Sequence, residues 1–321
     1  MTCSLNQYRM SIGIFHLKCL SKNRLSLSDK FFWAVVYPNL FFNIVVLPKL
    51  LIISGNIESN PGPALPPVNK NFSVCQMNAR SILAESDNLN FLDGLPPPKL
   101  CEFKTFVRDQ NFDIVAITET WLDNTIPDEV LKTSGYSTIF RRDRNRHGGG
   151  TALMVSDSLV VSRLHDIEPI NDEIMCFDVT LPGSKPVKHL FLCLCYRPPD
   201  RDILEFLHSF ELTIEAGQKG NFSAYVAIGD FNCRNSAFWV GDTSKHEGRM
   251  LKAVIDSYNL YQLVDFPTRF QDNSSSCLDL IITNRAMFIK NIIPYEPLHK
   301  CDHIPLSFEI AVQYPKIKPF K

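Results

Sequence analysis

Polar residues suited to hydrolytic chemistry recur at the ends of apolar runs in this sequence. Glu119 follows the run DIVAIT, Asp230 follows YVAIG, and His303 precedes IPLSFEI. Carboxylate oxygens are ligands that Mg²⁺ and Mn²⁺ prefer, and a carboxylate or an imidazole can accept or donate a proton. The pattern therefore indicates hydrolysis at a site that needs a divalent cation. The other polar residues placed in this way are Asn78, Tyr196, Asn232, Asp279 and Asp302.

Short runs rich in β-branched and aromatic residues must position these side chains, because catalytic groups commonly lie on loops at the ends of strands. Such runs alternate with polar turns and three helical patterns from residue 72 onward, which favours an α/β sandwich over a regular βαβ repeat. The expected helices cover residues 100–110, 203–215 and 247–258. The expected strands cover residues 72–77, 114–118, 151–155, 173–181, 189–195, 224–228, 277–283 and 305–312.

The charge distribution excludes a protein that binds nucleic acid through bulk positive charge. The chain of 321 residues has 33 Lys and Arg against 34 Asp and Glu, for a net charge of −1. Residues 1–71 are basic, with seven Lys or Arg and two acidic residues, so the remainder is acidic. An acidic body suits a carboxylate-rich site that binds a cation. The ordinary globular composition also excludes collagen, coiled coils and wholesale disorder.

The ten cysteines do not form a recognisable metal or disulfide motif. None of them has CxxC spacing, and none clusters with histidine at zinc-finger intervals. Cys193 and Cys195 fall on one face of an expected strand, where buried thiols are common. We therefore expect unpaired cysteines and a reducing compartment.

The N-terminal part is expected to be separate from the globular body. An irregular leader at 1–54 contains an apolar segment at 31–53, of which residues 31–48 are uncharged and reach the minimum length of a membrane span. Two prolines and two asparagines interrupt this stretch, so we expect no membrane insertion. A linker rich in Pro and Asn at 55–71 marks the boundary of the body at 72–312, and 313–321 reads as a tail.

Eight motifs in order resemble those of the endonuclease/exonuclease/phosphatase superfamily, and two of them resemble the branch carried by non-LTR (LINE-like) retrotransposons. The resemblance covers about residues 72–312. The two branch motifs are GGGTALMV (148–155) and FPTRF (266–270). The others are MNARS (77–81), ITETWL (117–122), YRPP (196–199), GDFN (229–232), LDLIITN (278–284) and CDHIPL (301–306).

The resemblance implies a four-layer α/β sandwich, in which two packed mixed β-sheets are flanked by helices and carry the site at one edge. It implies that Glu119 binds Mg²⁺, or Mn²⁺ in its place, with Asn78 beside it and Asp302 as a further candidate ligand. Asp230 would activate or align the attacking water, and Asn232 would hold the water and the phosphate. Cys301 departs from the family pattern, since many relatives have serine before the Asp-His pair.

The remaining implied roles concern the phosphate and the DNA. His303 and Tyr196 would bind the scissile phosphate, and Asp279 would hydrogen-bond His303 and keep it cationic. Thr268 resembles a position that contacts phosphate, although a capping hydroxyl would look the same. An arginine run precedes the glycine turn. It could form a solvated loop, or it could bind DNA phosphates. Its members are Arg141, Arg142, Arg144 and Arg146.

Each of these positions also has a purely structural interpretation. Asn78 could simply end a strand, Tyr196 could pack in the core, and Asp230 with Asn232 could form an Asx-turn. Glu119 could be a surface acid and His303 a buried structural histidine. We favour the functional interpretation because the whole set occurs together and in order.

The resemblance implies a Mg²⁺-dependent DNA endonuclease that nicks target DNA and leaves a 3′-hydroxyl to prime reverse transcription. The alternatives are a repair nuclease for abasic sites, a phosphatase of the same fold, or a non-catalytic membrane-tethered remnant. The expected partners are DNA and a reverse transcriptase encoded elsewhere in the parent element. Because the sequence ends at Lys321 before any reverse transcriptase, we expect a truncated chain, a fragment, or a separately retained endonuclease. The expected location is nuclear or cytoplasmic.

Residues 55–63 carry a second resemblance, to the ribosome-skipping peptides of some viruses and LINE-like elements. The segment reads GNIESNPGP, and skipping would separate Gly62 from Pro63. Asn56 stands where such peptides usually have Asp, so we expect a reduced yield. The alternative is an ordinary Pro/Gly turn in the linker.

Overall fold

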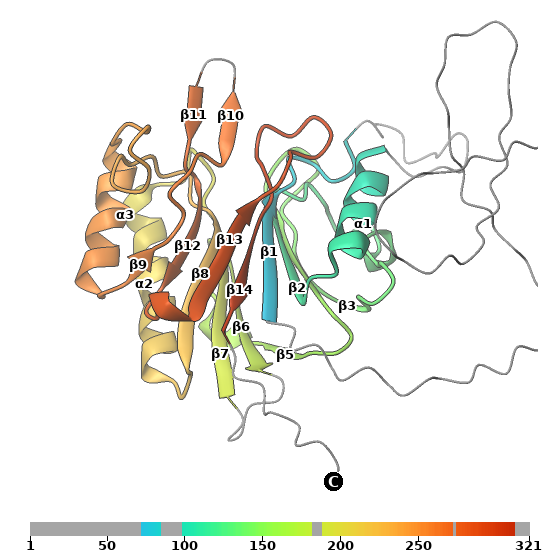
Figure 1. Cartoon of the computed structure of the whole chain (residues 1–321), viewed down its shortest axis with the longest axis horizontal. Helices are drawn as coiled ribbons and strands as arrows, with labels where there is room; N and C mark the ends of the chain where they lie inside the picture. Colours follow the sequence, from blue (N-terminus) through green and yellow to red (C-terminus); the bar gives the residue numbers. More distant parts are fainter. Residues whose placement is uncertain (1–71, 85–97, 182–187, 272–273, 312–321) are drawn as a thin grey trace, which may run out of the picture. The chain divides into compact units, whose positions relative to one another are not determined.

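Two six-stranded β-sheets lie face to face in the part of the chain that the structure describes, which comprises residues 72–84, 98–181, 188–271 and 274–311 of the computed structural model. Helix α1 (Pro98–Gln110) covers the outer face of one sheet, and α2 (Ile203–Lys219) and α3 (His246–Ser257) cover the other (Figure 1). The four layers confirm the expected α/β sandwich.

The first sheet carries the N- and C-terminal strands of the described body. Its order is β13-β14-β1-β2-β4-β3, with β1 parallel to β2 and all other pairs antiparallel. Residues Asp128–Val130 and Ala286–Phe288 form short 3₁₀ helices in its connections. The strands are β1 (Phe72–Asn78), β2 (Ile114–Thr118), β3 (Thr138–Arg142), β4 (Thr151–Val155), β13 (Ile289–Pro294) and β14 (Leu306–Ile310).

The second sheet has the order β5-β6-β7-β8-β12-β9, and only its β7–β8 pair is parallel among the described strands. Helix α2 makes the crossover between β7 and β8, as a parallel pair requires. A separate hairpin is formed by β10 (Arg269–Gln271) and β11 (Ser274–Ser276). The 3₁₀ helix His165–Ile167 follows β5. The strands are β5 (Val160–Arg163), β6 (Glu173–Leu181), β7 (Lys188–Tyr196), β8 (Ala224–Asp230), β9 (Tyr261–Gln262) and β12 (Asp279–Thr283).

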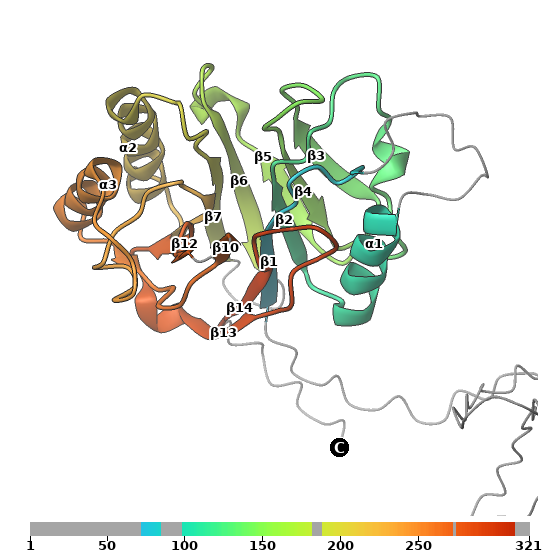
Figure 2. The ribbon, with the colours of Figure 1, turned by 90° about the horizontal axis from the view of Figure 1, so that it is seen from above.

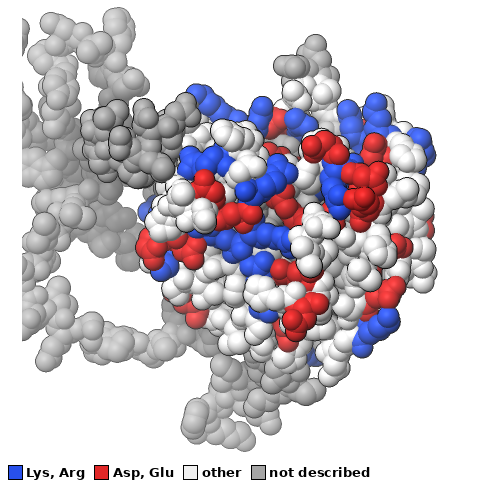
Figure 3. All heavy atoms as spheres, turned by 180° about the vertical axis from the view of Figure 1, so that it is seen from behind, with Lys and Arg blue, Asp and Glu red and all other residues white. Residues whose placement is uncertain are grey.

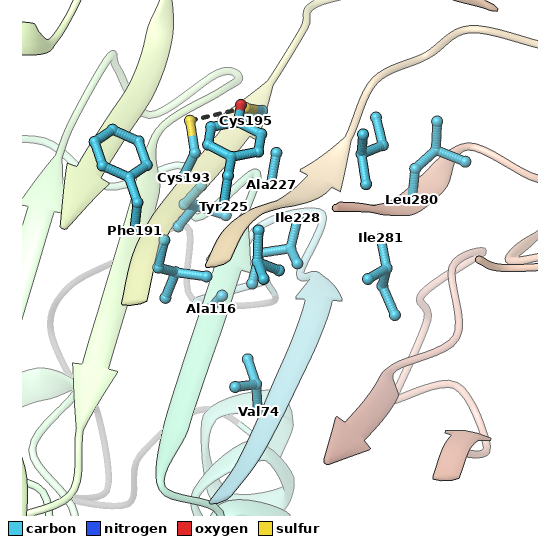
Figure 4. Close-up of a cluster of buried hydrophobic side chains, with 14 of the residues drawn as sticks. Val74, Ala116, Phe191, Cys193, Cys195, Tyr225, Ala227, Ile228, Leu280 and Ile281 are labelled. Atoms are coloured by element: carbon cyan, nitrogen blue, oxygen red, sulfur yellow. Dashed lines mark hydrogen bonds between the residues drawn. The ribbon is translucent and has the colours of Figure 1, made fainter. Parts of the chain in front are cut away.

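The alternation of side chains along buried strands builds a core on both faces of each sheet. Val74 and Ala116 of the first sheet and Ile228 of the second lie between the two sheets (Figure 4). Phe191 and Tyr225 point to the opposite side of the second sheet, toward α2 (Figure 4). A sheet buried on both faces is held firmly, and it can position side chains at its edge with little freedom.

All eight expected strands and all three expected helices are present, with ends shifted by a few residues. The strand expected at 277–283 begins at Asp279, and the one expected at 305–312 ends at Ile310. Strands β3, β5 and β13 and the short β9, β10 and β11 were not predicted from the sequence. The first three lie at or next to sheet edges and are partly exposed, so their sequences lack the apolar pattern of a buried strand.

The leader, the linker with the skipping site at Gly62 and Pro63, and the tail lie outside the described residues. The separation of these segments from the body therefore stays a prediction. Within the described ranges, no helix has both the length and the apolar character that crossing a membrane demands.

Candidate active site

Five strand ends converge at one edge of the sandwich. The parallel pair β1–β2 places Asn78 beside Thr118, and the parallel pair β7–β8 places Tyr196 beside Asp230. The antiparallel pairing of β12 with β8 places Asp279 opposite Asp230. Figure 2, seen from above, shows the two sheets side by side, with β1 near the middle of the molecule. The strand register therefore brings together residues that are up to 200 positions apart in sequence.

One amide group links two of the carboxylates. The Nδ2 of Asn78 donates to Oε1 of Glu119 at 2.8 Å and to Oδ2 of Asp230 at 2.8 Å. The Oδ1 of Asn78 accepts from the backbone N–H of Arg80 at 2.9 Å, which fixes the orientation of the amide. Trp121 donates from Nε1 to the other oxygen of Glu119 at 3.2 Å. Glu119 and Asp230 are thus held close together although they come from different sheets.

His303 is oriented by a buried carboxylate. Its Nδ1 lies 2.7 Å from Oδ2 of Asp279, and its Nε2 lies 3.9 Å from Oδ2 of Asp230. Gln76 donates from Nε2 to the second oxygen of Asp279 at 2.8 Å. The hydroxyl of Thr268 accepts the backbone N–H of Asp279 at 3.0 Å and so fixes the start of β12. Gln76 and Thr268 therefore position Asp279, which in turn aims the free nitrogen of His303 toward Asp230.

The surroundings raise the pKa values of both Asp230 and His303, but to different levels. Burial raises the pKa of Asp230 to about 7, and the charges of Asp279 and Glu119 add to this increase while His303 opposes it. Burial by itself lowers the pKa of His303, but the charge of Asp279 and the hydrogen bond to it raise that pKa to about 9. His303 is consequently a cation at neutral pH, and Asp230 can exchange a proton in that range.

The donor set fits a divalent cation. The ligand atoms of Asp230, Asp279 and His303 lie within 4.8 Å of one another, and Glu119 is joined to Asp230 through Asn78. Asp279 and His303 are occupied with each other, so the oxygens of Glu119 and Asp230 are the better ligands. Asn78 turns its Nδ2 toward both carboxylates and its Oδ1 toward the N–H of Arg80, and its role as a metal ligand stays a prediction. Within the described residues, three carboxylates here face the single cationic side chain of His303. A bound cation would offset this excess of negative charge.

Asp302 is not part of this cluster. Its Oδ2 accepts from Nε of Arg269 at 2.9 Å, and its Oδ1 lies 3.2 Å from Nη1 of Arg80. Burial acts to raise the pKa of Asp302, but the hydrogen bond from Arg269 and the charge of His303 lower it below its ordinary value. The backbone N–H of Phe270 also donates to the carbonyl of Asp302 at 2.7 Å. Asp302 thus ties the β10–β11 hairpin to the site, and its role as a metal ligand stays a prediction.

Tyr196 and Asn232 lie beside Asp230. Tyr196 is buried, and burial together with the charges of Glu119 and Asp230 raises the pKa of its hydroxyl, which remains protonated. Asn232 has a left-handed backbone with φ 48°, its N–H donates to Oδ1 of Asp230 at 2.9 Å, and its side chain donates to the carbonyl of Arg197 at 2.8 Å. This is the Asx-turn considered as an alternative, and it fixes the carboxylate of Asp230 from the second side.

The backbone just before Asp230 requires glycine. Gly229 has φ 134°, and a Cβ there would lie 1.9 Å from the carbonyl oxygen of Cys195 on the neighbouring strand. The absence of a side chain therefore lets β8 approach β7 at this point. Glu119 (φ 51°) and Trp121 (φ 54°) also have left-handed backbones, which for non-glycine residues are costly and concentrate at functional sites.

The first two arginines of the run are occupied by protein groups. The Arg141 side chain is only 9% exposed and pairs with Asp128 at 2.9 Å and with Asp143 at 2.7 Å. Arg142 donates to three backbone carbonyls within residues 169–174. Both residues lie in β3, with Arg142 as its last residue, where the sequence suggested a loop. The structure therefore does not place these two guanidinium groups at the site.

The other two arginines of the run remain nearer to solvent or to the site. Arg144 pairs with Glu173 at 3.0 Å, and its guanidinium carbon lies 6.0 Å from the ring centre of Tyr196. Arg146 has one buried Nη1 without a hydrogen-bond partner in the described structure. Glu173 was not predicted as a site residue from the sequence; it accepts from the N–H of Gly150, and burial raises its pKa. Its position at the start of an expected strand was the signal available.

Comparisons with known proteins agree with this geometry. Residues 190–307 match a family described as "Endonuclease-reverse transcriptase". A search of curated proteins found no match. Among solved structures, the chain is similar to the endonuclease domain of TRAS1, described as a telomere-specific non-LTR retrotransposon, with 18% identity and a TM-score of 0.57. That alignment covers 75% of this chain and 99% of the other.

Two further solved structures share the same fold. The AP endonuclease LMAP from Leishmania major has 14% identity and a TM-score of 0.56, over 75% of this chain and 87% of its own. The APE2 catalytic domain of Xenopus laevis has 15% identity and a TM-score of 0.56, over 74% and 91%. Such identities establish the fold, while the family match falls on the segment that carries Asp230, Asp279 and His303. Residues 190–307 thus match the endonuclease–reverse transcriptase family, and the described body has the fold shared by the endonuclease/exonuclease/phosphatase enzymes.

Proposed function

We propose that the chain is a Mg²⁺-dependent DNA endonuclease of a non-LTR retrotransposon, which nicks target DNA and leaves a 3′-hydroxyl that primes reverse transcription. The observation that carries the proposal is the pairing of a proton acceptor with a proton donor at the end of β8. Asp230, with a pKa of about 7, lies 3.9 Å from the cationic His303. Mn²⁺ would serve in place of Mg²⁺, since both prefer oxygen ligands.

In this proposal, the side chains of the site divide the work of in-line hydrolysis. Asp230 is oriented by Asn78 and by the N–H of Asn232, and it accepts the proton of the attacking water. His303, aimed by Asp279, donates from Nε2 to a phosphate oxygen, and the protonated hydroxyl of Tyr196 donates to another. Glu119, with Asn78 beside it, would hold the divalent cation, which would supply charge to offset the negative charge on the phosphate.

DNA is the proposed partner, and a reverse transcriptase from the parent element is the proposed downstream enzyme. Basic and acidic side chains are mixed on the face shown in Figure 3, without one large field of a single sign. On this face, any affinity for DNA would therefore come from a few local phosphate contacts. Arg144 and Arg146 remain candidates for such contacts, whereas Arg141 and Arg142 are occupied within the protein.

The decisive experiment is nicking of supercoiled plasmid by the full chain in Mg²⁺, in Mn²⁺ and in EDTA. We expect open circles with either metal and none with EDTA. The new ends should be extended by a DNA polymerase without prior treatment, because the cut leaves a 3′-hydroxyl. Absence of nicking in both metals would overturn the proposal.

A second candidate is repair-type cleavage at abasic sites, which is favoured by the fold shared with AP endonucleases. Duplexes with and without one abasic site separate the two functions. The retrotransposon proposal expects efficient cutting of intact DNA at preferred sequences. A repair enzyme would cut the abasic duplex much faster and leave the intact duplex untouched.

We also propose that translation skips the bond between Gly62 and Pro63 in part of the products. Pro61 fixes φ of the nascent end, and Pro63 must attack through a hindered secondary amine. Cell-free translation with a tag at each end should give two fragments, and Asn56→Asp should raise their yield. A single full-length band that Pro63→Ala leaves unchanged would mark the segment as an ordinary linker.

A further inference from the structure

A basic cavity lies beside the candidate active site and was not expected from the sequence. It has a volume of about 320 Å³ and lies between the loop after β8, the first turn of α3 and the β10–β11 hairpin. It shares Asn232 with the site, and the backbone of that residue contacts Asp230. Its charged lining residues are Arg197, Arg234, Lys245, Arg269 and Glu247.

Two of these arginines are neutralised and one is not. Arg234 pairs with Asp242 at 2.7 Å, and Arg269 pairs with Asp302 at 2.9 Å. Arg197 is only 3% exposed, but within the described residues it has no carboxylate partner. Its Nη2 donates to the carbonyl of Arg201 at 2.6 Å, and its Nη1 lies 3.4 Å from the carbonyl of Asn232.

The Nε of Arg197 is buried and has no hydrogen-bond partner among the described residues. A buried cation without a counter-charge is costly, and proteins keep such a group where a ligand supplies the missing anion. Since Arg197 lines the cavity, an anion bound there would compensate its charge.

The first turn of α3 gives independent support. Lys245 stands immediately before this twelve-residue helix and lines the cavity, and no partner for its ammonium group is recorded in the described part of the chain. The N-terminal end of a helix favours anions through its dipole and its free N–H groups. Glu247 also lines the cavity and is the one acidic group there among the described residues, so the surplus of positive charge is modest.

We propose that this cavity holds a phosphate group of the cut DNA strand, next to the phosphate that is hydrolysed. The inference rests on the proposed function and deepens it by assigning a second phosphate contact. Phosphates repeat at every nucleotide of a strand, so a strand with its scissile phosphate at Asp230 and His303 brings a neighbouring phosphate to the adjoining surface. Arg197, Lys245 and the first turn of α3 bind it.

The test combines changes in the protein with single changes in the DNA. Duplexes that contain a mapped cut site carry one neutral methylphosphonate at each position flanking the cut. With the wild type, one flanking position should lower kcat/KM by about tenfold, as expected for the loss of one charged hydrogen-bonded contact. Arg197→Gln should cleave the unmodified duplex with a kcat/KM lower than that of the wild type by a similar factor. The same methylphosphonate should then cause little further loss.

Binding of the same duplexes in EDTA gives a readout that does not depend on cleavage. Loss of one phosphate contact should reduce the slope of log affinity against log salt by about 0.9. Lys245→Met is the second variant, because an exposed side chain can be changed without unfolding the protein. Arg108→Gln, on the exposed surface of α1, is the matched control and should behave as wild type.

The outcomes are separable. If every methylphosphonate position costs the wild type and both variants equally, and the salt slopes agree, the cavity does not bind a phosphate. If wild type fails to nick any duplex, the proposed function fails, but binding in EDTA still decides whether the cavity holds a DNA phosphate. If Arg197→Gln does not fold, Lys245→Met decides. The proposal is supported if the methylphosphonate at one flanking position no longer lowers kcat/KM of Lys245→Met. It is overturned if that methylphosphonate lowers kcat/KM as much as in the wild type.

Discussion

The carboxylates in the two halves of the site have different hydrogen-bond and ion-pair partners. In the half around Asn78, Glu119 and Asp230 share one neutral amide donor, and among the described residues no arginine or lysine pairs with either. In the half around His303, Asp279 is bound to a cationic imidazole and Asp302 to Arg269. The acids in the second half are neutralised by the protein itself, whereas those in the first half are not.

This difference separates reacting groups from groups that position them. Burying charge without compensation costs stability, so it persists where a ligand completes the site. Asp279 and Asp302 hold other residues in place, and their own charges are already balanced. Changes of Glu119 or Asp230 should therefore abolish chemistry or metal binding, whereas changes of Asp279 or Asp302 should act through the geometry and the pKa of the residues they hold.

Asp230→Asn should have the largest effect. It keeps the volume and most hydrogen bonds but removes the proton acceptor, and loss of a general base typically costs about 10²–10⁴ in rate. Plasmid nicking measures the loss, and thermal unfolding followed by circular dichroism shows whether the fold is intact. Turnover like that of wild type would exclude Asp230 as the base.

Asp279 and His303 should behave as one unit. Asp279→Ala and His303→Ala should each remove much of the rate, and the double variant should lose little more than the worse single variant. The measurement is single-turnover cleavage of a duplex with one cut site. Losses that multiply in the double variant would show that the two residues act separately, and the proposed orientation of His303 by Asp279 would be wrong.

Metal removal should distinguish the two halves by stability. Mg²⁺ that binds only the folded state at about 100 times its Kd would add about 2.7 kcal/mol, or several degrees in Tm. Glu119→Gln should lose most of this shift. Asp302→Asn is the matched control, and it should retain most of the shift because Asp302 is already paired with Arg269. Equal losses in both variants would place Asp302 among the ligands.

The smallest effect should be a change in the titration of His303. In EDTA its imidazole resonances should report a pKa of about 9, and Asp279→Asn should lower this toward the ordinary value of 6.5. Because the folded state keeps a proton that the unfolded state loses, His303 stabilises the fold fully below 6.5. That contribution disappears as the pH rises through about 9. A wild-type titration near 6.5 would contradict the ion pair.

The buried strands were predictable from sequence because burial leaves an apolar pattern that is independent of the rest of the fold. The ends of those strands also identified Asn78, Glu119 and Asp230 as candidates. Edge strands such as β3 were missed because a solvated face keeps its polar residues. The central strands of each sheet were therefore easier to predict from the sequence than the edge strands.

Pairings between distant residues could not be predicted. Gln76 supports Asp279 across 203 positions, and this contact depends on how the two sheets face each other. Arg141 and Arg197 look alike in the sequence, but one is saturated with carboxylates and the other is buried without any. Side-chain partners are set by the tertiary arrangement, so residue type alone does not tell a structural arginine from a binding one.

The tight contact at Gly229 has a consequence for recognising inactive gene copies. A copy that has acquired Ser or Asp at this position would keep every charged and polar residue of the site, and a search for those residues would count it as intact. Any side chain there meets the carbonyl of Cys195, so the strand must move and carry Asp230 with it. Surveys of related sequences should therefore score this glycine together with the acids and the histidine.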